Sequence, residues 1–196
     1  MKKGTIIGLS IAGLIVIIFL WGNGLYNSMV TSDEVVSKSW ANVESQYQRR
    51  SDLIPNLVSA VKGYATHESS TLEGVVAARA KATQITIDPK NLTSEKLQEY
   101  QAAQGQVSSA LGKLLMITEN YPNLKANQNF LELQAQLEGT ENRISVERNR
   151  FNDVAKSYDV TIQRFPKSII AALFGFEKKP YFEAEKGSEK APTVKF

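Results

Sequence analysis

The first part of the chain is one uninterrupted apolar run. No charged residue occurs from Gly4 to Leu25, and the stretch from Thr5 to Leu20 is almost wholly apolar. A helix of about 20 residues, rising ~1.5 Å per residue, crosses the ~30 Å hydrocarbon core of a bilayer. Trp21 and Tyr26 follow, at positions typical of interfacial aromatic side chains. The pattern predicts a single transmembrane helix within residues 1–25 that is embedded in membrane lipid.

The charges that flank this run predict its orientation. Lys2 and Lys3 precede the run, whereas the acidic residues 33–34 follow it. By the positive-inside rule we expect the N-terminus in the cytoplasm and the bulk of the chain outside it. A cleaved signal peptide is the alternative, but only Gly22 and Gly24 approach the small-residue cleavage site that it needs. We favour a retained signal-anchor, which makes the chain a single-pass membrane protein.

Small residues recur along one face of the predicted anchor. Gly4, Gly8 and Ala12 are spaced four residues apart, a pattern that lets two transmembrane helices pack closely. The alternative is that glycine is simply common in membrane helices. A homo-oligomer packed through this face therefore stays open.

Beyond the anchor, helical periodicity dominates and strand alternation is nearly absent. Residues 26–165 divide into four amphipathic segments with short connections, which predicts an antiparallel four-helix bundle of long helices. The first stripe has apolar residues three, four or seven positions apart: Tyr26, Met29, Val36, Trp40, Val43 and Tyr47. Thr31 and Glu34 form a capping-box pattern, so a helix break between anchor and bundle is expected near Gly22 and Gly24, with a continuous helix as the alternative.

A proline interrupts the first stripe within "QRRSDLIPNLV" at 48–58. Proline cannot donate to the carbonyl four residues before it, so it kinks a helix or lies in its first turn. We favour a break near Ser51, with Asp52 as N-cap of a second helix that runs to about Gln84. One long kinked helix is the alternative. Both predict an exposed polar elbow, which we define as Arg49, Arg50, Asp52, Pro55 and Asn56.

The third and fourth helices carry the clearest stripes. The third is expected to bury Leu97, Tyr100, Gln104, Val107, Leu111, Leu114 and Thr118. The fourth has a coiled-coil-like repeat of seven, made by Phe130, Leu137, Ile144, Phe151, Tyr158 and Phe165. Glu141 and Arg148 lie on the seam beside this repeat, where charged side chains are rarely buried unless paired. With the polar elbow they form either an interaction site or a structural polar layer that fixes helix register.

The C-terminal part divides into two segments. Residues 166–182 are short and apolar, and the side chains that we expect to contact a membrane surface or a partner are Ile169, Ile170, Leu173, Phe174 and Phe176. Packing against the end of the bundle is the alternative. Residues 183–196 are charged and contain glycine and proline, which predicts a disordered tail.

Composition argues against several kinds of chemistry. The chain has 23 basic and 20 acidic residues spread along its length, so no basic stripe indicates nucleic acid. It has no cysteine and a single histidine, His67, which removes thiolate nucleophiles and the usual zinc sites. We therefore expect no metal, no cofactor and no enzymatic activity. A hydrolase that uses Glu138 and Glu141, one turn apart, is a minor alternative.

The chain resembles the LemA family of bacterial membrane-anchored helical proteins, from the anchor to about Ala184. The motifs that carry the resemblance are Arg49-Arg50, Asp52-Leu53-Ile54-Pro55-Asn56-Leu57-Val58, Val61-Lys62-Gly63-Tyr64, Tyr121-Pro122-Asn123-Leu124-Lys125-Ala126-Asn127, Phe130, Leu137-Glu138-Gly139-Thr140-Glu141-Asn142, Ile144, Arg148, Asn152, Phe165-Pro166, Phe174-Gly175-Phe176 and Pro180-Tyr181-Phe182. Phe151 departs from the tyrosine that members often carry, which argues against a role for a hydroxyl there. The resemblance implies one N-terminal anchor, a four-helix bundle and no enzymatic activity. It also suggests an envelope protein partner, such as an envelope-stress or membrane-protease system that the chain serves as an adaptor.

Overall fold

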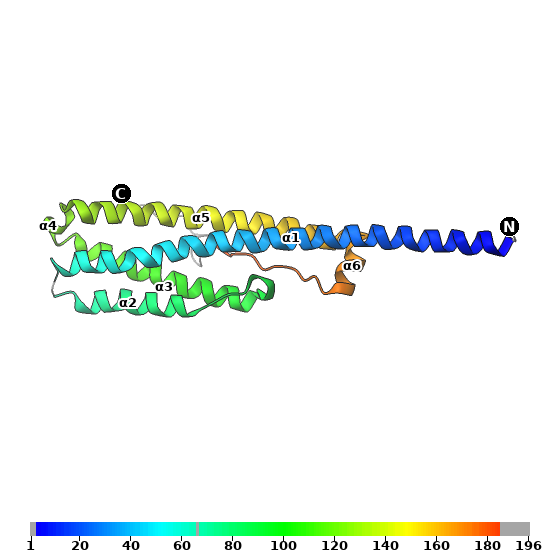
Figure 1. Ribbon diagram of the computed structural model, residues 1–196. Helices are drawn as coiled ribbons and strands as arrows, with labels where there is room; N and C mark the ends of the chain where they lie inside the picture. The colour runs from blue at the N-terminus through cyan, green and yellow to red at the C-terminus, as the bar shows by residue number, and fades with distance from the viewer. Residues whose placement is uncertain (1–2, 66, 185–196) are drawn as a thin grey trace, which may run out of the picture.

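The computed structural model describes residues 3–65 and 67–184 of the chain. In these ranges the protein is all-α and contains no β-strand, in agreement with the sequence pattern. Figure 1 shows the elements, which are α1 (Lys3–Lys62), α2 (Ser69–Gln84), the 3-10 helix η1 (Pro89–Asn91), α3 (Ser94–Thr118), α4 (Pro122–Lys125), α5 (Gln128–Gln163) and α6 (Lys167–Phe174).

Helix α1 is 60 residues long and joins the apolar run to the helical body without interruption. Its N-terminal part is long and apolar enough to cross a membrane, and none of that stretch is buried against the rest of the chain. The expected break near Gly22 and Gly24 is wrong. Thr31 does not cap a helix, because its hydroxyl donates to the carbonyl oxygen of Asn27 at 2.9 Å, as serines and threonines inside helices often do.

The break expected near Ser51 is also wrong, because α1 continues through Pro55. The carbonyl of Ser51 lies four residues before Pro55 and therefore lacks its usual helical donor. Arg79 of α2 supplies the missing donor, with Nε 2.8 Å from that oxygen. Asp52 caps nothing and accepts instead from the side-chain amide of Gln48 at 2.8 Å. A hydrogen bond from another helix thus replaces the one that proline removes.

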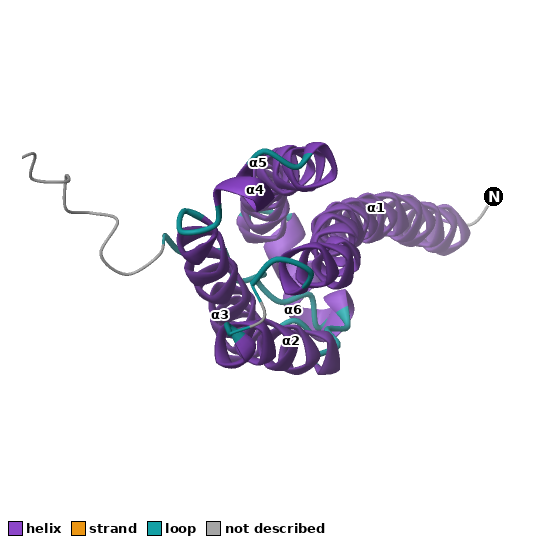
Figure 2. Cartoon of the chain, turned by 90° about the vertical axis from the view of Figure 1, so that its left-hand side faces the viewer, coloured by secondary structure: helices purple, strands orange, loops and turns teal. Residues whose placement is uncertain are grey.

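The long helices lie side by side around a common core. Helix α1 packs mainly along α5 and also contacts α2, while α2 packs along α3. The end-on view in Figure 2 places α1 between α5 and α2, with α3 on the opposite side from α1. At the end of the body next to the apolar part of α1, helix α6 packs against both α5 and α1.

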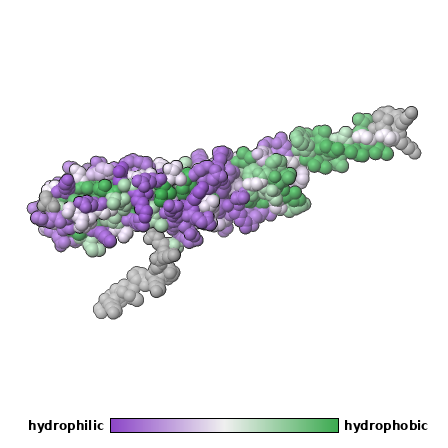
Figure 3. All heavy atoms as spheres, turned by 90° about the horizontal axis from the view of Figure 1, so that it is seen from below, coloured by the Kyte–Doolittle hydropathy of each residue, from purple (hydrophilic) through white to green (hydrophobic). Residues whose placement is uncertain are grey.

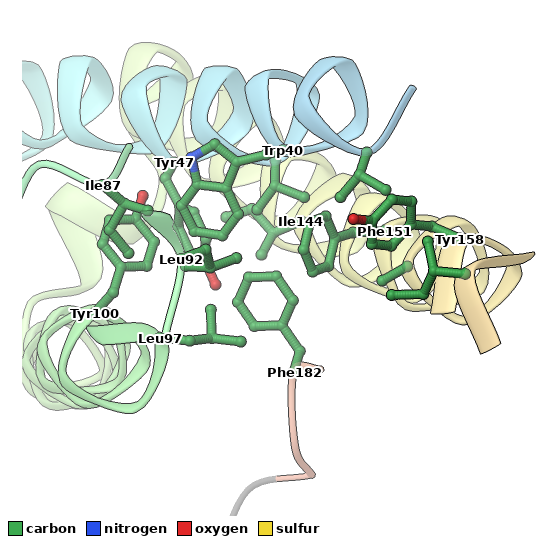
Figure 4. Close-up of a cluster of buried hydrophobic side chains, with 14 of the residues drawn as sticks. Trp40, Tyr47, Ile87, Leu92, Leu97, Tyr100, Ile144, Phe151, Tyr158 and Phe182 are labelled. Atoms are coloured by element: carbon green, nitrogen blue, oxygen red, sulfur yellow. The ribbon is translucent and has the colours of Figure 1, made fainter. Parts of the chain in front are cut away.

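The core consists of two hydrophobic clusters. The proximal cluster is the one nearer the apolar part of α1, and it includes Met29, Val36, Trp40, Val43, Tyr47, Tyr100, Ile144, Phe151, Tyr158 and Phe182. The distal cluster includes Ile54, Leu57, Val61, Leu72, Val75, Ala103, Val107, Leu111, Leu114, Phe130 and Leu137. Figure 4 shows the aromatic centre of the proximal cluster. Burying one large apolar side chain contributes about 1.5–3 kcal/mol, so these clusters hold the long helices together.

The stripes predicted for the third and fourth helices are largely confirmed. All seven expected residues of α3 are buried. On α5 the repeat is buried from Phe130 to Tyr158, but Phe165 is 82% exposed because the helix ends at Gln163.

After α6 the chain returns along the body without regular secondary structure, as Figure 1 shows. Gly175 makes the turn with φ of 76°, a left-handed conformation that favours glycine. Phe182 then enters the proximal cluster, where its ring stacks on Trp40 at 5.8 Å between centroids. We call residues 176–184 the C-terminal strap. The rest of the tail predicted to be disordered, 185–196, lies outside the described residues.

Candidate functional site

A buried arginine lies between the two hydrophobic clusters. Arg50 of α1 is 2% exposed. Its guanidinium donates to Gln104 Oε1 at 2.6 Å, to the Gln104 carbonyl at 3.0 Å and to Ser108 Oγ at 2.7 Å, all on α3. It also pairs with Glu141 of α5 at 2.9 Å. We call these four residues the polar layer, and through them one side chain joins three helices.

The polar layer interrupts the apolar core. Tyr47, one turn before Arg50 on α1, belongs to the proximal cluster, whereas Ile54, one turn after it, belongs to the distal cluster. Removing a guanidinium from water costs several kcal/mol, and only good hydrogen-bond geometry offsets that cost. Arg50 meets this condition with four close acceptors and also lies over the Tyr47 ring, 5.1 Å from its centroid.

The tyrosines beside the polar layer are held neutral. Burial raises the pKa of Tyr47, although the guanidinium groups of Arg148 and Arg50 act to lower it. Burial also raises the pKa of Tyr100, and the neighbouring Tyr47 adds to that rise. These phenols therefore remain protonated at physiological pH, and they serve the layer as apolar rings.

A groove of about 620 Å³ opens above the polar layer, between α3 and α5. Tyr47 and Arg50 form its floor, Gln101 and Gln104 belong to the α3 wall, and Arg148 belongs to the α5 wall. The groove is therefore lined by amides, guanidinium groups and the Glu141 carboxylate, which suits a ligand that offers both hydrogen-bond acceptors and donors.

The C-terminal strap closes one end of this groove. The carbonyl oxygen of Glu183 accepts from Gln101 Nε2 at 2.7 Å and from Arg148 Nη2 at 2.9 Å. One backbone carbonyl thus bridges the α3 and α5 walls. The Arg148 guanidinium also lies over the Phe182 ring, 4.9 Å from its centroid. The strap shows how the groove holds an extended chain.

Two side chains of α5 fix the strap. Asn152 donates to the Phe182 carbonyl at 2.9 Å and accepts from the Phe182 amide at 2.8 Å. Asp159 accepts from the Lys179 amide at 3.0 Å and from the Tyr181 hydroxyl at 2.5 Å. Burial and the hydrogen bond to the Asp159 carboxylate raise the pKa of Tyr181 to about 12. The strap is therefore attached at both its backbone and its side chains.

The residues expected to form the site divide into two groups. Arg50, Glu141 and Arg148 line the groove. Glu141 pairs with Arg50 and not with Arg148, which contacts the strap. The exposed polar elbow is wrong, because α1 has no turn there and Arg50 is buried, while the remaining members are exposed: Arg49, Asp52, Pro55 and Asn56. Since successive helical residues point about 100° apart, Arg49 and Arg50 cannot face the same side.

Several residues of the site do not stand out in the sequence. Gln104 is expected only as part of a buried stripe, yet it gives Arg50 two acceptors. Its position in an apolar stripe, four residues before Ser108, is the signal that a polar layer passes there. Arg79 has no such signal, since only the fold brings it to Ser51.

The five residues of the C-terminal segment expected to contact a membrane or a partner also fall into two groups, one packed on the core and one exposed. Ile170 and Phe176 pack against the proximal cluster, whereas Ile169, Leu173 and Phe174 are exposed. The expected anchor-packing residues Gly4, Gly8 and Ala12 are exposed along α1.

Histidine, aspartate and glutamate side chains are the groups among the described residues that metal binding or acid–base chemistry would use. No group of three or more histidine, aspartate or glutamate side chains there is arranged to hold a metal ion. The two glutamates of the hydrolase alternative have different partners: Glu138 accepts from Gln134 at 3.0 Å on the surface, and Glu141 pairs with Arg50. His67 is exposed.

Comparison with known proteins gives one family and a small set of relatives. A profile of the LemA family matches residues 39–196, which leaves the apolar run outside the match. Magnetosome protein MamQ 2 of Paramagnetospirillum magneticum is 27% identical over 186 residues, covering 86% of this chain and 68% of that protein. MamQ of Magnetospirillum gryphiswaldense is equally similar. Protein LemA of Metamycoplasma hominis is 22% identical over 161 residues, covering 82% of this chain and 70% of that protein.

Proposed function

The chain belongs to the LemA family, and we propose that it is a membrane-anchored, non-enzymatic interaction protein of the bacterial envelope. The apolar part of α1 is the single-pass anchor, with the N-terminus in the cytoplasm and the helical body outside it. The groove between α3 and α5 is the site where a partner is captured. The observation that carries the proposal is the Glu183 carbonyl, which both walls of the groove bind at once.

The same proposal includes the architecture of the body. We take α1, α2, α3 and α5 to form an antiparallel four-helix bundle that is open along the seam between α3 and α5. The packing of α1 on α5, of α1 on α2 and of α2 on α3 supports this arrangement. An open seam gives a partner access to side chains that a closed bundle would bury.

The proposed occupant of the groove is an extended peptide segment of an envelope protein. An extended chain presents backbone carbonyl and amide groups that no helix satisfies, and glutamine side chains both donate and accept. The strap is such a chain, and it binds at one end of the groove. A partner segment would continue along the groove toward Arg50, with its carbonyls accepting from the N–H groups of Gln101 and Arg148 that do not donate to Glu183.

A purely structural role is the competing interpretation of the polar layer. Arg50 supports it, because its guanidinium is buried and already satisfied by Gln104, Ser108 and Glu141. Arg148 supports capture, because it lies at the rim of the groove and bonds to a chain segment. We therefore assign helix register to Arg50 and partner binding to Arg148 and Gln101.

Site-directed cross-linking in native membranes tests the proposal. The chain has no cysteine, so Gln98→Cys, which lines the groove, can carry a photoactivatable benzophenone as the only label. Arg143→Cys, exposed on α5 and absent from the groove lining, is the matched control. We expect adducts at position 98 alone, mapping to one extended segment whose synthetic peptide competes, with loss of the adduct in Arg148→Leu.

Three results would contradict this proposal. Equal labelling at positions 98 and 143 would mean that the groove is not selective. Adducts that persist when the synthetic peptide is added would mean that the captured segment does not occupy the groove. Adducts confined to this chain's own residues 185–196 would make the groove an internal binding site.

A further inference from the structure

Four large apolar side chains are exposed close together around α6. Phe165 is 82% exposed, Ile169 62%, Leu173 76% and Phe174 59%. Single exposed apolar residues are ordinary, but four within residues 165–174 indicate a contact surface. We call these four residues the α6 face. Figure 3 shows hydrophobic surface at the end of the body that adjoins the apolar part of α1.

The α6 face lies beside the point where the apolar run of α1 ends. The Phe174 and Phe176 rings pack on Tyr26, with centroids 4.9 Å and 5.6 Å away. Lys167 Nζ donates to Ser28 Oγ at 2.9 Å. Tyr26 lies six residues after Leu20, where the almost wholly apolar stretch ends, and seven residues before Asp33, the next charged residue. If α1 crosses the bilayer, these contacts place α6 at the level of the lipid headgroups.

Helix α6 is held firmly in this position. Ala171 is buried, and Ile170 and Phe176 pack against the proximal cluster. The amide of Phe176 donates to the Ala171 carbonyl at 2.9 Å and closes the end of the helix. Because one side of α6 is fixed to the core, Ile169 and Leu173, one turn apart, are directed away from it.

We propose that the α6 face inserts into the interface of the bilayer that α1 spans, as a second membrane contact. An amphipathic helix in the interface buries its apolar side chains among the lipid acyl chains while basic side chains reach the headgroups. Arg164 and Lys178, exposed on either side of α6, suit anionic headgroups, and Glu177 is the exposed acid among them. A second copy or a partner protein is less suited, because it would have to fit between the body and the membrane.

This inference rests on α1 spanning the membrane and not on the groove. Its consequence is geometric, since two contacts fix the tilt of the body where a lone helix would leave it free. The seam between α3 and α5 would then have a defined height and direction relative to the bilayer.

Lipid-quenching fluorescence on the full chain tests the inference. Leu173→Cys carries the environment-sensitive dye NBD, in nanodiscs that hold one copy of the protein, with or without doxyl-labelled phospholipid. Ser145→Cys, exposed on α5 in the body, is the matched control. We expect a blue-shifted emission and quenching of at least twofold at position 173, with water-like, unquenched emission at 145.

Each other outcome has a definite meaning. Water-like emission at both positions would overturn the inference. A blue shift at 173 without quenching by lipid would also overturn it, because the dye would then lie against protein. Ile169→Cys, on the same face one turn earlier, guards against a local effect of the label at 173 and should give the same result as Leu173→Cys.

Discussion

Arg79 on α2 donates its Nε–H to the carbonyl oxygen of Ser51 on α1, at 2.8 Å. That carbonyl is the one that Pro55 leaves without a helical donor, and Ser51 is buried. A buried carbonyl without a partner costs about 1–3 kcal/mol. The contact therefore allows a proline inside a 60-residue helix without breaking it, and it ties α2 to the C-terminal part of α1.

The first prediction is a coupling between these two positions. Arg79→Leu should lower the free energy of unfolding by about 1–3 kcal/mol, because it leaves the Ser51 carbonyl unsatisfied. In a Pro55→Ala background the same change should cost much less, since the backbone amide of the introduced alanine restores the helical donor. Chemical denaturation of the full chain in detergent, followed by circular dichroism, gives the four values of the cycle. If the free-energy changes of Arg79→Leu and Pro55→Ala simply add in the double variant, the Arg79 hydrogen bond does not compensate for the proline.

The second prediction concerns the ion pair of the polar layer. Glu141→Ala should destabilise the protein by about 3 kcal/mol, because it removes the countercharge of a buried guanidinium. This value lies at the lower end of the range for breaking a buried ion pair, because the Glu141 side chain is 38% exposed. Glu138→Ala, on the exposed side of α5, should change stability by less than about 0.5 kcal/mol. Equal effects of the two changes on the denaturation midpoint would refute the structural role given to Arg50.

The third prediction separates folding from binding. Arg148→Leu should leave the helical content intact and cost no more than about 1 kcal/mol, because its contacts lie at the rim of the groove and not in the core. Cross-linking at position 98 should be lost in the same variant. An unfolded Arg148→Leu protein, or one with altered helix register, would assign Arg148 to the structural layer and remove the support for capture.

The fourth prediction is a pH dependence of the strap. Because the folded-state pKa of Tyr181 is raised to about 12 from its usual 10.0, the protonated phenol stabilises the folded state. Its contribution is complete below pH 10 and is lost as the pH rises through about 12. The unfolding free energy of the natural chain should therefore fall more steeply over this interval than that of Tyr181→Phe. Parallel profiles would mean that the hydroxyl is not held by Asp159.

The sequence predicts the parts of this structure that depend on periodicity. The buried stripe of α3 and the repeat of α5 follow from spacing alone, because apolar residues at helical spacing lie on the one face of the helix that packs on the core. Phe165 belongs to the predicted repeat but is exposed, because α5 ends two residues before it. The apolar run similarly identifies the part of α1 that stays outside the helical body.

Contacts between distant segments are what the sequence could not supply. The sequence around Pro55 predicts a helix break because neighbouring residues offer no donor for the Ser51 carbonyl. The donor is Arg79, which lies 28 residues from Ser51 along the chain, on another helix. Arg50 reads as an exposed charge for the same reason, since its acceptors come from α3 and α5. The strap shows no helical pattern, and its order depends on Asn152 and Asp159.

The central claim is that one membrane-spanning helix holds the helical body outside the cytoplasm. Ser145→Cys tests it directly, because Ser145 is exposed on α5 and the natural chain has no thiol. Intact cells are treated with a membrane-impermeant maleimide, and the protein is then recovered from the membrane fraction. We predict labelling at position 145 before lysis. Protection until the cells are lysed, or recovery of the protein with the soluble contents, would contradict the account.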